Sequence, residues 1–437
     1  MKNILGCFFI IITALSSCKK ESTHAFDKSP DERINETISN YQSKLSGAQY
    51  GWKAVVMTDS GKGATYSFYF KFNDANRVVM YADFDSSSAV TAKESSYRLK
   101  ALQQPSLIFD TYSYLHLLSD PNENTVTVQS DVNGFKGGAL GQGLRSDFEF
   151  AIDTATTDSI KLTGRLHGSK AVLIRATQQE AAAYNNRGLF SGFLFKNLGK
   201  YLYYFKRITI GGIAYEINTN LNTRTINFSW LDASGNLQTF TTGFYYTVNG
   251  IEFANPFTNG SQIITGFRNI TWDAATTTLA FSVNGTSTTV IGVPQPLKVD
   301  LGAPKRWYDF AANQQDVWVS FDGFHVNGID DAFGVRALPG YRYMFYYPNY
   351  GSGYDWAGIV AATNYGPAMR ATFQTNGTVK FTTPYNFGTI PTAATTTVTR
   401  IRTQFLEANG YYLVQTSPLS YDMVSALDGK AWISWEF

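Results

Sequence analysis

The densest run of aromatic rings in the chain is YRYMFYYPNYGSGYDW, from Tyr341 to Trp356. Exposed Tyr and Trp rings could stack on the C–H faces of sugars, because these side chains join an apolar body to a polar tip. Neighbouring Asn and Asp side chains could bond the sugar hydroxyls. The candidate ligand-binding residues are Tyr346, Tyr347, Tyr350, Tyr354 and Trp356. One alternative stays open, in which the run is a hairpin whose alternate rings fill a core.

Paired carboxylates are a second possible chemistry, because two of them suffice for glycoside hydrolysis. The candidate segment is DGFHVNGIDD, from Asp322 to Asp331. However, Asn327-Gly328 within it is a dipeptide typical of hairpin turns. A glycan hydrolase is therefore a weaker alternative, and the sequence assigns no catalytic residue.

The chain has four histidines, His24, His116, His167 and His325, and none lies close in sequence to another. A zinc site needs about three protein ligands, so we predict no metal site. His116 is interpreted as part of a strand, where Asp120 would lie roughly 13 Å away by strand rise alone. This separation argues against an acid/base pair. The glycine-rich stretch 137–143 has no helix after it and predicts no phosphate site, so we expect no cofactor.

The N-terminal sequence predicts that the protein is located in the cell envelope. A lysine and a short apolar run precede Leu15-Ser16-Ser17-Cys18. The apolar run is shorter than the roughly 20 residues that span a bilayer, which favours a lipoprotein signal peptide over residues 1–17. Cys18 is then the lipidated residue, and 18–28 is a tether. No Asp follows Cys18, so we expect the outer membrane and leave its face open.

Composition favours strands and excludes a nucleic-acid partner. Lys and Arg number 36 against 34 Asp and Glu, which leaves a net charge of +2 and no basic footprint. Charged residues make up 16% of the chain and aromatic residues 15%. Few charges and many rings fit pleated, half-buried surfaces.

Local patterns predict where helices and strands lie. Ser29 and Glu32 form a capping box before an apolar stripe, which predicts a helix over 29–47. Alternating residues then predict a β meander that completes a first domain over 29–175. Its later strands are expected at 96–102, 107–118, 125–129, 147–153, 160–165 and 171–175.

A second capping box, Thr177 to Glu180, opens a second helix and meander over 177–292. Val293 to Pro296 is interpreted as a linker before a β-rich region over 297–437, which has no clear capping box. The expected fold is mostly β. Antiparallel meanders form two or three barrel- or sandwich-like modules, with a short helix before each of the first two.

Several segments resemble a family of Bacteroidetes cell-envelope lipoproteins known only as a domain of unknown function (4302). They are FDKSPDERINETISNYQ from Phe26, Gly51-Trp52, LIFDTYSYLHLLSDP from Leu107 and SDFEF from Ser146. The resemblance is specific over 18–175 and looser beyond. It implies a lipoprotein found with outer-membrane nutrient-uptake systems of the TonB-dependent transporter type. It supplies no catalytic or ligand residues.

We therefore expect a non-enzymatic outer-membrane lipoprotein that binds a nutrient or glycan, or that assists an uptake complex. Its expected partners are the membrane, through the lipid on Cys18, and a transporter complex or a glycan. A structural or protein-interaction lipoprotein without a small ligand is the alternative. A small barrel could also hold one apolar ligand inside, which would require small inward-facing residues.

Overall fold

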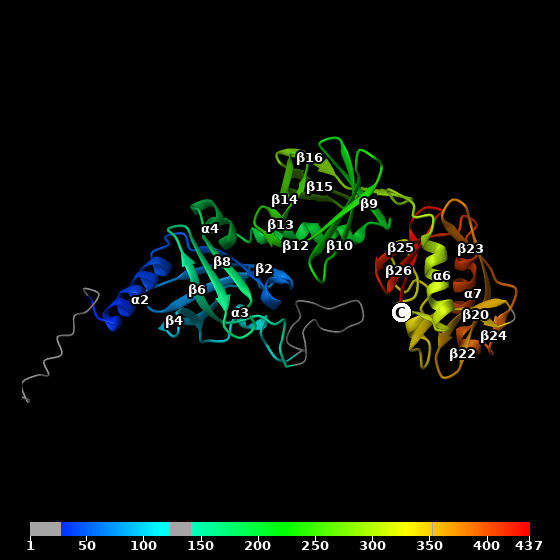
Figure 1. Cartoon of the computed structure of the whole chain (residues 1–437), viewed down its shortest axis with the longest axis horizontal. Coiled ribbons are helices and arrows are strands. Elements are labelled where there is room, and N and C mark those ends of the chain that lie inside the picture. Colours follow the sequence, from blue (N-terminus) through cyan, green and yellow to red (C-terminus); the bar gives the residue numbers. More distant parts are fainter. Residues whose placement is uncertain (1–27, 123–140, 352) are drawn as a thin grey trace, which may run out of the picture.

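The computed structural model describes residues 28–122, 141–351 and 353–437. Three units follow one another along the long axis of the molecule, in chain order (Figure 1). Each unit is built on one antiparallel sheet. This arrangement confirms the predicted mostly-β fold of antiparallel meanders. Within the described ranges, no helix is both long and apolar enough to cross a membrane.

The first unit begins with helix α2 (Pro30–Ser46), and its capping box is present as predicted: the Ser29 side chain accepts from the Glu32 N–H. Eight strands follow and close into a barrel by pairing the first with the last. The strands are β1 (Trp52–Met57), β2 (Thr65–Phe72), β3 (Arg77–Ala82), β4 (Lys93–Ala101), β5 (Pro105–Phe109), β6 (Glu149–Ala155), β7 (Ser159–Gly164) and β8 (Lys170–Arg175). A short 3-10 helix, η1 (Asp59–Gly61), joins β1 to β2.

Large rings fill the interior of this barrel. Trp52, Phe68, Phe70 and Phe109 are each no more than 2% exposed and belong to one packed core. An eight-stranded barrel has an interior just wide enough for side chains or one small ligand. Because bulky rings occupy the inward positions here, the structure contradicts the alternative of an apolar ligand inside this barrel.

The predicted strand over 107–118 is wrong in its second half. Strand β5 ends at Phe109, and the chain then forms a one-turn helix, α3 (Tyr114–Leu117). Ser113 is its N-cap, and the His116 side chain accepts from the Ser113 N–H. His116 is therefore a helical residue. The predicted strand over 125–129 lies outside the described residues.

The second unit opens with the predicted capping box, in which the Thr177 side chain accepts from the Glu180 N–H. Its helical segments are α4 (Gln178–Asn185), α5 (Leu189–Phe193) and the 3-10 helix η2 (Leu194–Lys200). Nine strands follow: β9 (Phe205–Ile210), β10 (Ile213–Asn220), β11 (Thr225–Leu231), β12 (Leu237–Thr247), β13 (Gly250–Asn259), β14 (Gln262–Asp273), β15 (Thr278–Val283), β16 (Thr286–Thr289) and β17 (Ile291–Val293). Strand β17 returns to pair with β9, which makes the sheet barrel-like.

A buried ion pair joins the first two units. Arg224 Nη1 lies 2.7 Å from Asp83 Oδ2, and the two side chains are 3% and 0% exposed. The same arginine donates to the Thr65 and Asp83 carbonyls, and its guanidinium lies over the rings of Tyr66 and Tyr246. Asp83 also accepts from the Tyr246 N–H. Strand β2 of the first barrel thereby packs beside β12 of the second.

The third unit contains two helices that the sequence did not predict, α6 (Ala303–Gln314) and α7 (Thr395–Phe405). Both bury apolar residues against one face of the sheet. The strands are β18 (Trp318–Ser320), β19 (His325–Val326), β20 (Tyr343–Gly351), β21 (Tyr354–Val360), β22 (Asn364–Phe373), β23 (Thr378–Thr382), β24 (Asn386–Phe387), β25 (Tyr411–Ser417), β26 (Ser420–Ser425) and β27 (Ala431–Glu436). Pairing of β18 with both β20 and β27 closes the sheet into a ring. Two 3-10 turns, η3 (Val335–Ala337) and η4 (Thr392–Ala394), lie in its loops.

The second and third units also share polar contacts. The Tyr204 hydroxyl donates to Asp422 Oδ2 over 2.6 Å, and the Tyr204 N–H donates to the Gly429 carbonyl over 2.7 Å. The Tyr204 ring packs edge-on against Trp432. These contacts hold the start of the second sheet against the end of the third.

Candidate functional site

The aromatic run predicted from the sequence forms most of the hairpin β20–β21. Tyr347 lies opposite Trp356 in this hairpin, and Phe345 lies opposite Gly358. Because side chains alternate across a strand, these residues share the face of the sheet that points away from α6 and α7. Rings on this face form a continuous cluster, here called the aromatic patch. Its members are Phe345, Tyr347, Tyr350, Tyr354, Trp356, Tyr385 and Phe387.

Tyr350 is the centre of the aromatic patch. Its ring centroid lies 4.7 Å from that of Trp356, 5.0 Å from that of Phe387 and 5.5 Å from that of Tyr347. The residue is 44% exposed, whereas Trp356 beneath it is only 9% exposed. Tyr350 thus presents its ring to solvent, while the buried Trp356 ring mainly packs against it from below.

Tyr346 is separated from the other four predicted residues. It is fully buried on the opposite face, with its ring 4.6 Å from that of Trp307. Its hydroxyl donates to Asp355 Oδ2 over 2.7 Å. Burial, followed by the nearby Asp355 carboxylate, raises the pKa of Tyr346 well above its ordinary value. Because side chains alternate along a strand, both interpretations of the aromatic run apply to part of it. Tyr346 fills the core, and Tyr350 is exposed on the surface.

The buried carboxylate of Asp355 holds the patch in place from below. Besides Tyr346, its partners are the Tyr308 hydroxyl at 2.8 Å, the Asn349 N–H at 2.9 Å and the Ala371 N–H at 3.2 Å. These donors come from α6, β20 and β22. The Asn349 contact fixes the irregular segment between Tyr347 and Gly351, where the hairpin register shifts and Tyr350 projects. Asn349 itself has a left-handed φ of 55°.

Close packing of a glycine also shapes the patch. A Cβ at Gly358 would lie 2.2 Å from Cζ of Phe345. The missing side chain therefore leaves the space in which the Phe345 ring lies flat enough to meet Trp356, at a centroid distance of 5.0 Å.

Three patch residues were not among the predicted candidates: Phe345, which lies within the aromatic run, and Tyr385 and Phe387, which lie outside it. Tyr385 and Phe387 reach the hairpin because the short strand β24 pairs with β22 at Gly366 and Pro367. Tyr385 is 39% exposed, and its ring lies 5.0 Å from that of Tyr354. The alternating rings of the Tyr-Asn-Phe segment are the only local signal, and nothing in it indicates the distant partner.

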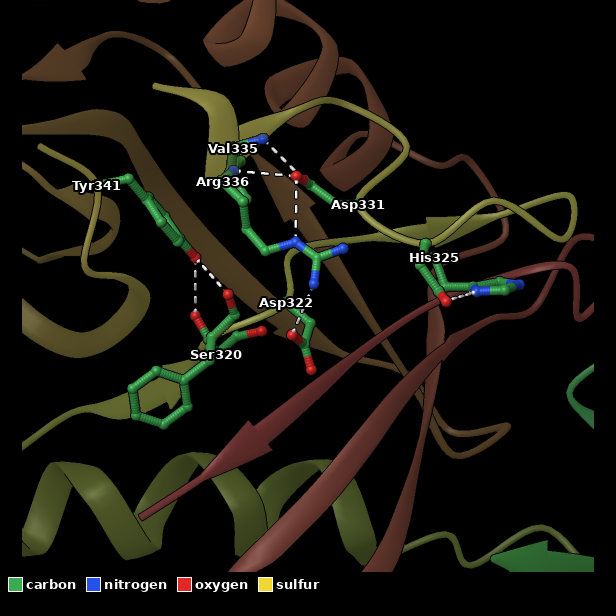
Figure 2. A network of polar contacts seen from close by, with 9 residues as sticks. Ser320, Asp322, His325, Asp331, Val335, Arg336 and Tyr341 are labelled. Atoms are coloured by element: carbon green, nitrogen blue, oxygen red, sulfur yellow. Dashed lines mark hydrogen bonds and ion pairs between the residues drawn. The ribbon is translucent and has the colours of Figure 1, made fainter. Parts of the chain in front are cut away.

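The carboxylates of 322–331 have structural partners (Figure 2). Arg336 lies between Asp322 and Asp331, 3.4 Å from each. Asp331 also accepts the N–H groups of Val335 and Arg336 over 2.7 Å and 3.0 Å. Asn327 and Gly328 both have positive φ, as the predicted hairpin turn requires. These contacts fasten the loop, and burial raises the pKa of Asp322.

His116 lies in an aromatic stack on the first barrel. Its ring is between those of Tyr112 and Phe148, at centroid distances of 5.6 Å and 4.9 Å. Nδ1 accepts from the Ser113 N–H, so Nε2, which is 3.2 Å from the Phe109 carbonyl, carries the proton. Asp120, considered above as its partner, accepts instead from the Tyr112 hydroxyl. Cys18 lies outside the described residues.

These features define a β-rich protein of three closed or nearly closed sheets, with a supported cluster of rings on its third sheet. The chain belongs to the family described as a domain of unknown function (DUF4302), whose model matches residues 22–274. The match spans the first unit and the second as far as the end of β14. The aromatic patch lies outside it.

No curated protein matches the chain. Among solved structures, a DNA polymerase III subunit beta sliding clamp from Bartonella birtlesii is 9% identical, with 91% of this chain and 97% of that chain covered and a TM-score of 0.12. The transferrin binding protein B from Neisseria meningitidis is 8% identical, with coverages of 88% and 75% and a TM-score of 0.14. Neither similarity is high enough to carry an argument about this chain.

Proposed function

We propose that this protein is a non-enzymatic glycan-binding lipoprotein of the outer membrane, attached through a lipid on Cys18. In this proposal it captures a polysaccharide through the aromatic patch and serves a nutrient-uptake complex of the TonB-dependent transporter type. The observation that carries the proposal is the exposure of Tyr350, which is 44% exposed although four further rings surround or support it.

The geometry of the patch suits a sugar chain. A ring presents a flat apolar face on which sugar C–H groups can stack, and its hydroxyl can bond a sugar hydroxyl. Tyr350 and Tyr385 supply two such exposed rings on adjoining segments. Their support by Trp356, Phe387 and the Asp355 network means that little side-chain freedom is lost on binding, which favours affinity.

The test is retardation of the full-length chain, in a mild non-ionic detergent, on native gels cast with a panel of polysaccharides. We expect retardation by at least one polymer. Tyr350→Ala should weaken binding about three- to tenfold, because loss of one stacking ring costs roughly 0.5–1.5 kcal/mol. Trp356 is a poor choice for this test, since its burial would confuse binding with stability.

Tyr112→Ala is the matched control, because Tyr112 is an exposed tyrosine of the first barrel and is remote from the patch. It should leave retardation unchanged. If no polymer retards the wild-type chain, glycan binding is contradicted, and the patch is better explained as an interface in a structural or protein-interaction lipoprotein.

A further inference from the structure

The segment that carries the aromatic patch has an unbalanced charge. Between residues 341 and 406 the sequence has one acidic residue, Asp355, and five basic ones. The basic residues are Arg342, Arg370, Lys380, Arg400 and Arg402. Asp355 is 2% exposed and turned toward the core. The exposed charges of this segment are therefore basic. Arg400 and Arg402 lie on α7, on the other face of the sheet from the aromatic patch, so the charge of the patch itself rests on Arg370 and Lys380.

Arg370 places one of these charges on the patch itself. Trp356 pairs with Ala368 in the β21–β22 register, so Arg370, two residues on, shares the face of Trp356. Its guanidinium carbon lies 4.2 Å from the centroid of the Tyr354 ring. Stacking on a ring holds a guanidinium flat and leaves its edge donors free.

No ion pair or side-chain hydrogen bond joins Arg370 to another residue in the described parts of the chain, and the residue is exposed. It differs in this from Arg336 and Arg224, which are both occupied by carboxylates. An arginine that is positioned on an aromatic ring but has no anionic partner among the described residues is suited to an anion supplied by a ligand.

Lys380 adds a second cation to the same face. Thr372 pairs with Lys380, and Arg370 pairs with Thr382, so these four residues share one side of β22 and β23. The Tyr347 hydroxyl donates to the carbonyl of Gln315. The acidic residue Asp316 follows Gln315 in the chain and is therefore close to the Tyr347 side of the patch. The cations are grouped at the Tyr354 side instead.

We propose that the ligand of the aromatic patch is an acidic glycan, whose carboxylate or sulfate groups bind Arg370 while its sugar rings stack on Tyr350 and Tyr385. This inference rests on the proposed function and specifies its ligand class. Uronate and sulfate share the required chemistry, since a guanidinium fork donates two parallel hydrogen bonds to either.

The test compares matched polymers against the full-length chain in a mild non-ionic detergent. Polygalacturonate is compared with its carboxyl-reduced form, and dextran sulfate with dextran. Affinity should be at least about tenfold higher for one acidic polymer than for its neutral partner, since a hydrogen bond to a charged group contributes roughly 1.5–3 kcal/mol. A difference in affinity within the polygalacturonate pair identifies the anion as a carboxylate, and a difference within the dextran pair identifies it as a sulfate.

Arg370→Gln should remove most of this preference, with about a tenfold loss for the acidic polymer and less than about twofold for the neutral one. Arg400→Gln, on an exposed arginine of α7 outside the patch, should leave both affinities unchanged. Thermal unfolding of both variants checks that the fold is intact.

Equal binding of acidic and neutral polymers, or unchanged selectivity in Arg370→Gln, would overturn the acidic-glycan inference and leave glycan binding standing. Absence of binding to every polymer would remove both proposals. Binding of single-stranded oligothymidylate as tight as that of the acidic polymer would also overturn the inference, because stacked rings with cations can hold nucleic acid.

Discussion

His116 links the protonation of one side chain to the packing around it. Its ring is stacked between two others, one nitrogen accepts a hydrogen bond, and the second donates to a carbonyl. A second proton would remove the acceptor and place a charge in a buried site. Burial accordingly lowers the pKa of His116 from its ordinary 6.5.

The pH dependence of stability follows from this shift. A histidine whose folded-state pKa is lowered stabilises the fold fully above its unfolded pKa, and this stabilisation is lost as pH falls through the folded value. We expect urea unfolding to show the wild type losing stability below about pH 6.5. His116→Gln should lose less over the same range. Parallel curves for the two chains would contradict this assignment.

The positions of some single residues could be predicted from the sequence, and those of others could not. Exposed rings at Tyr350 and its neighbours were one of two interpretations that the sequence left open, the other being rings that fill a core. Tyr385, Phe387 and Arg370 were not predicted, since their place on the patch depends on the pairing of β22 with β21 and β24. His116 was placed on a strand because one helical turn is too short for its period to differ from alternation.

At the scale of elements, Asp355 connects α6, β20, β21 and β22 through four donors. Asp355→Ala would leave these donors unsatisfied in a buried site. We expect a loss of about 3 kcal/mol or more in the free energy of unfolding, because each buried unsatisfied group costs roughly 1–3 kcal/mol. Retardation by a polysaccharide should weaken as well, since the segment that presents Tyr350 loses its anchor.

Asp232→Ala is the control for this experiment. Asp232 accepts the N–H groups of Ser234 and Asn236 in an exposed turn of the second unit. Its removal should cost far less stability than Asp355→Ala, because water replaces the lost contacts, and should leave glycan binding unchanged. A similar cost for both variants would show that the Asp355 network does not hold the elements together.

Two helices of the third unit could not be read from the sequence, for physical reasons. Helix α6 begins at Ala303, and its N-cap residue Gly302 has no side chain to accept a hydrogen bond, so the sequence there contains no capping box. Helix α7 has the sequence TTTVTRIRTQF, whose β-branched residues favour strands. Burial of Val398, Ile401 and Phe405 against the sheet outweighs this weak preference. The helices α2 and α4, which have capping boxes, were predicted.

For the whole molecule, the Arg224–Asp83 pair makes the first two units depend on each other. Arg224→Ala would leave the Asp83 carboxylate buried without its cation. Breaking one side of a buried pair costs about 3–5 kcal/mol, and we expect this loss in urea unfolding. Arg268→Ala, which breaks a pair with Glu252 that is 34% exposed on both sides, should cost at most about 1 kcal/mol.

Equal losses for these two variants would contradict the assignment of Arg224 as the link between the units. The extent of the family match agrees with such a link, since residues 22–274 include both partners of the pair. The third unit, which carries the aromatic patch, lies at the opposite end of the molecule from α2 (Figure 1). An anchor near the N-terminus would therefore hold the patch away from its point of attachment.

Closure of the sheets has a consequence for how copies of this protein coexist. In the first barrel β1 pairs with β8, and in the third ring β18 pairs with β27, so the main sheet of each is joined end to end. Open strand edges are what allow one chain to add to another and aggregate. Strand addition by another copy of this chain is therefore confined to short end strands, such as β16 at one end of the second sheet and β19 beside β27 in the third. Most of the sheet edge is not available for aggregation.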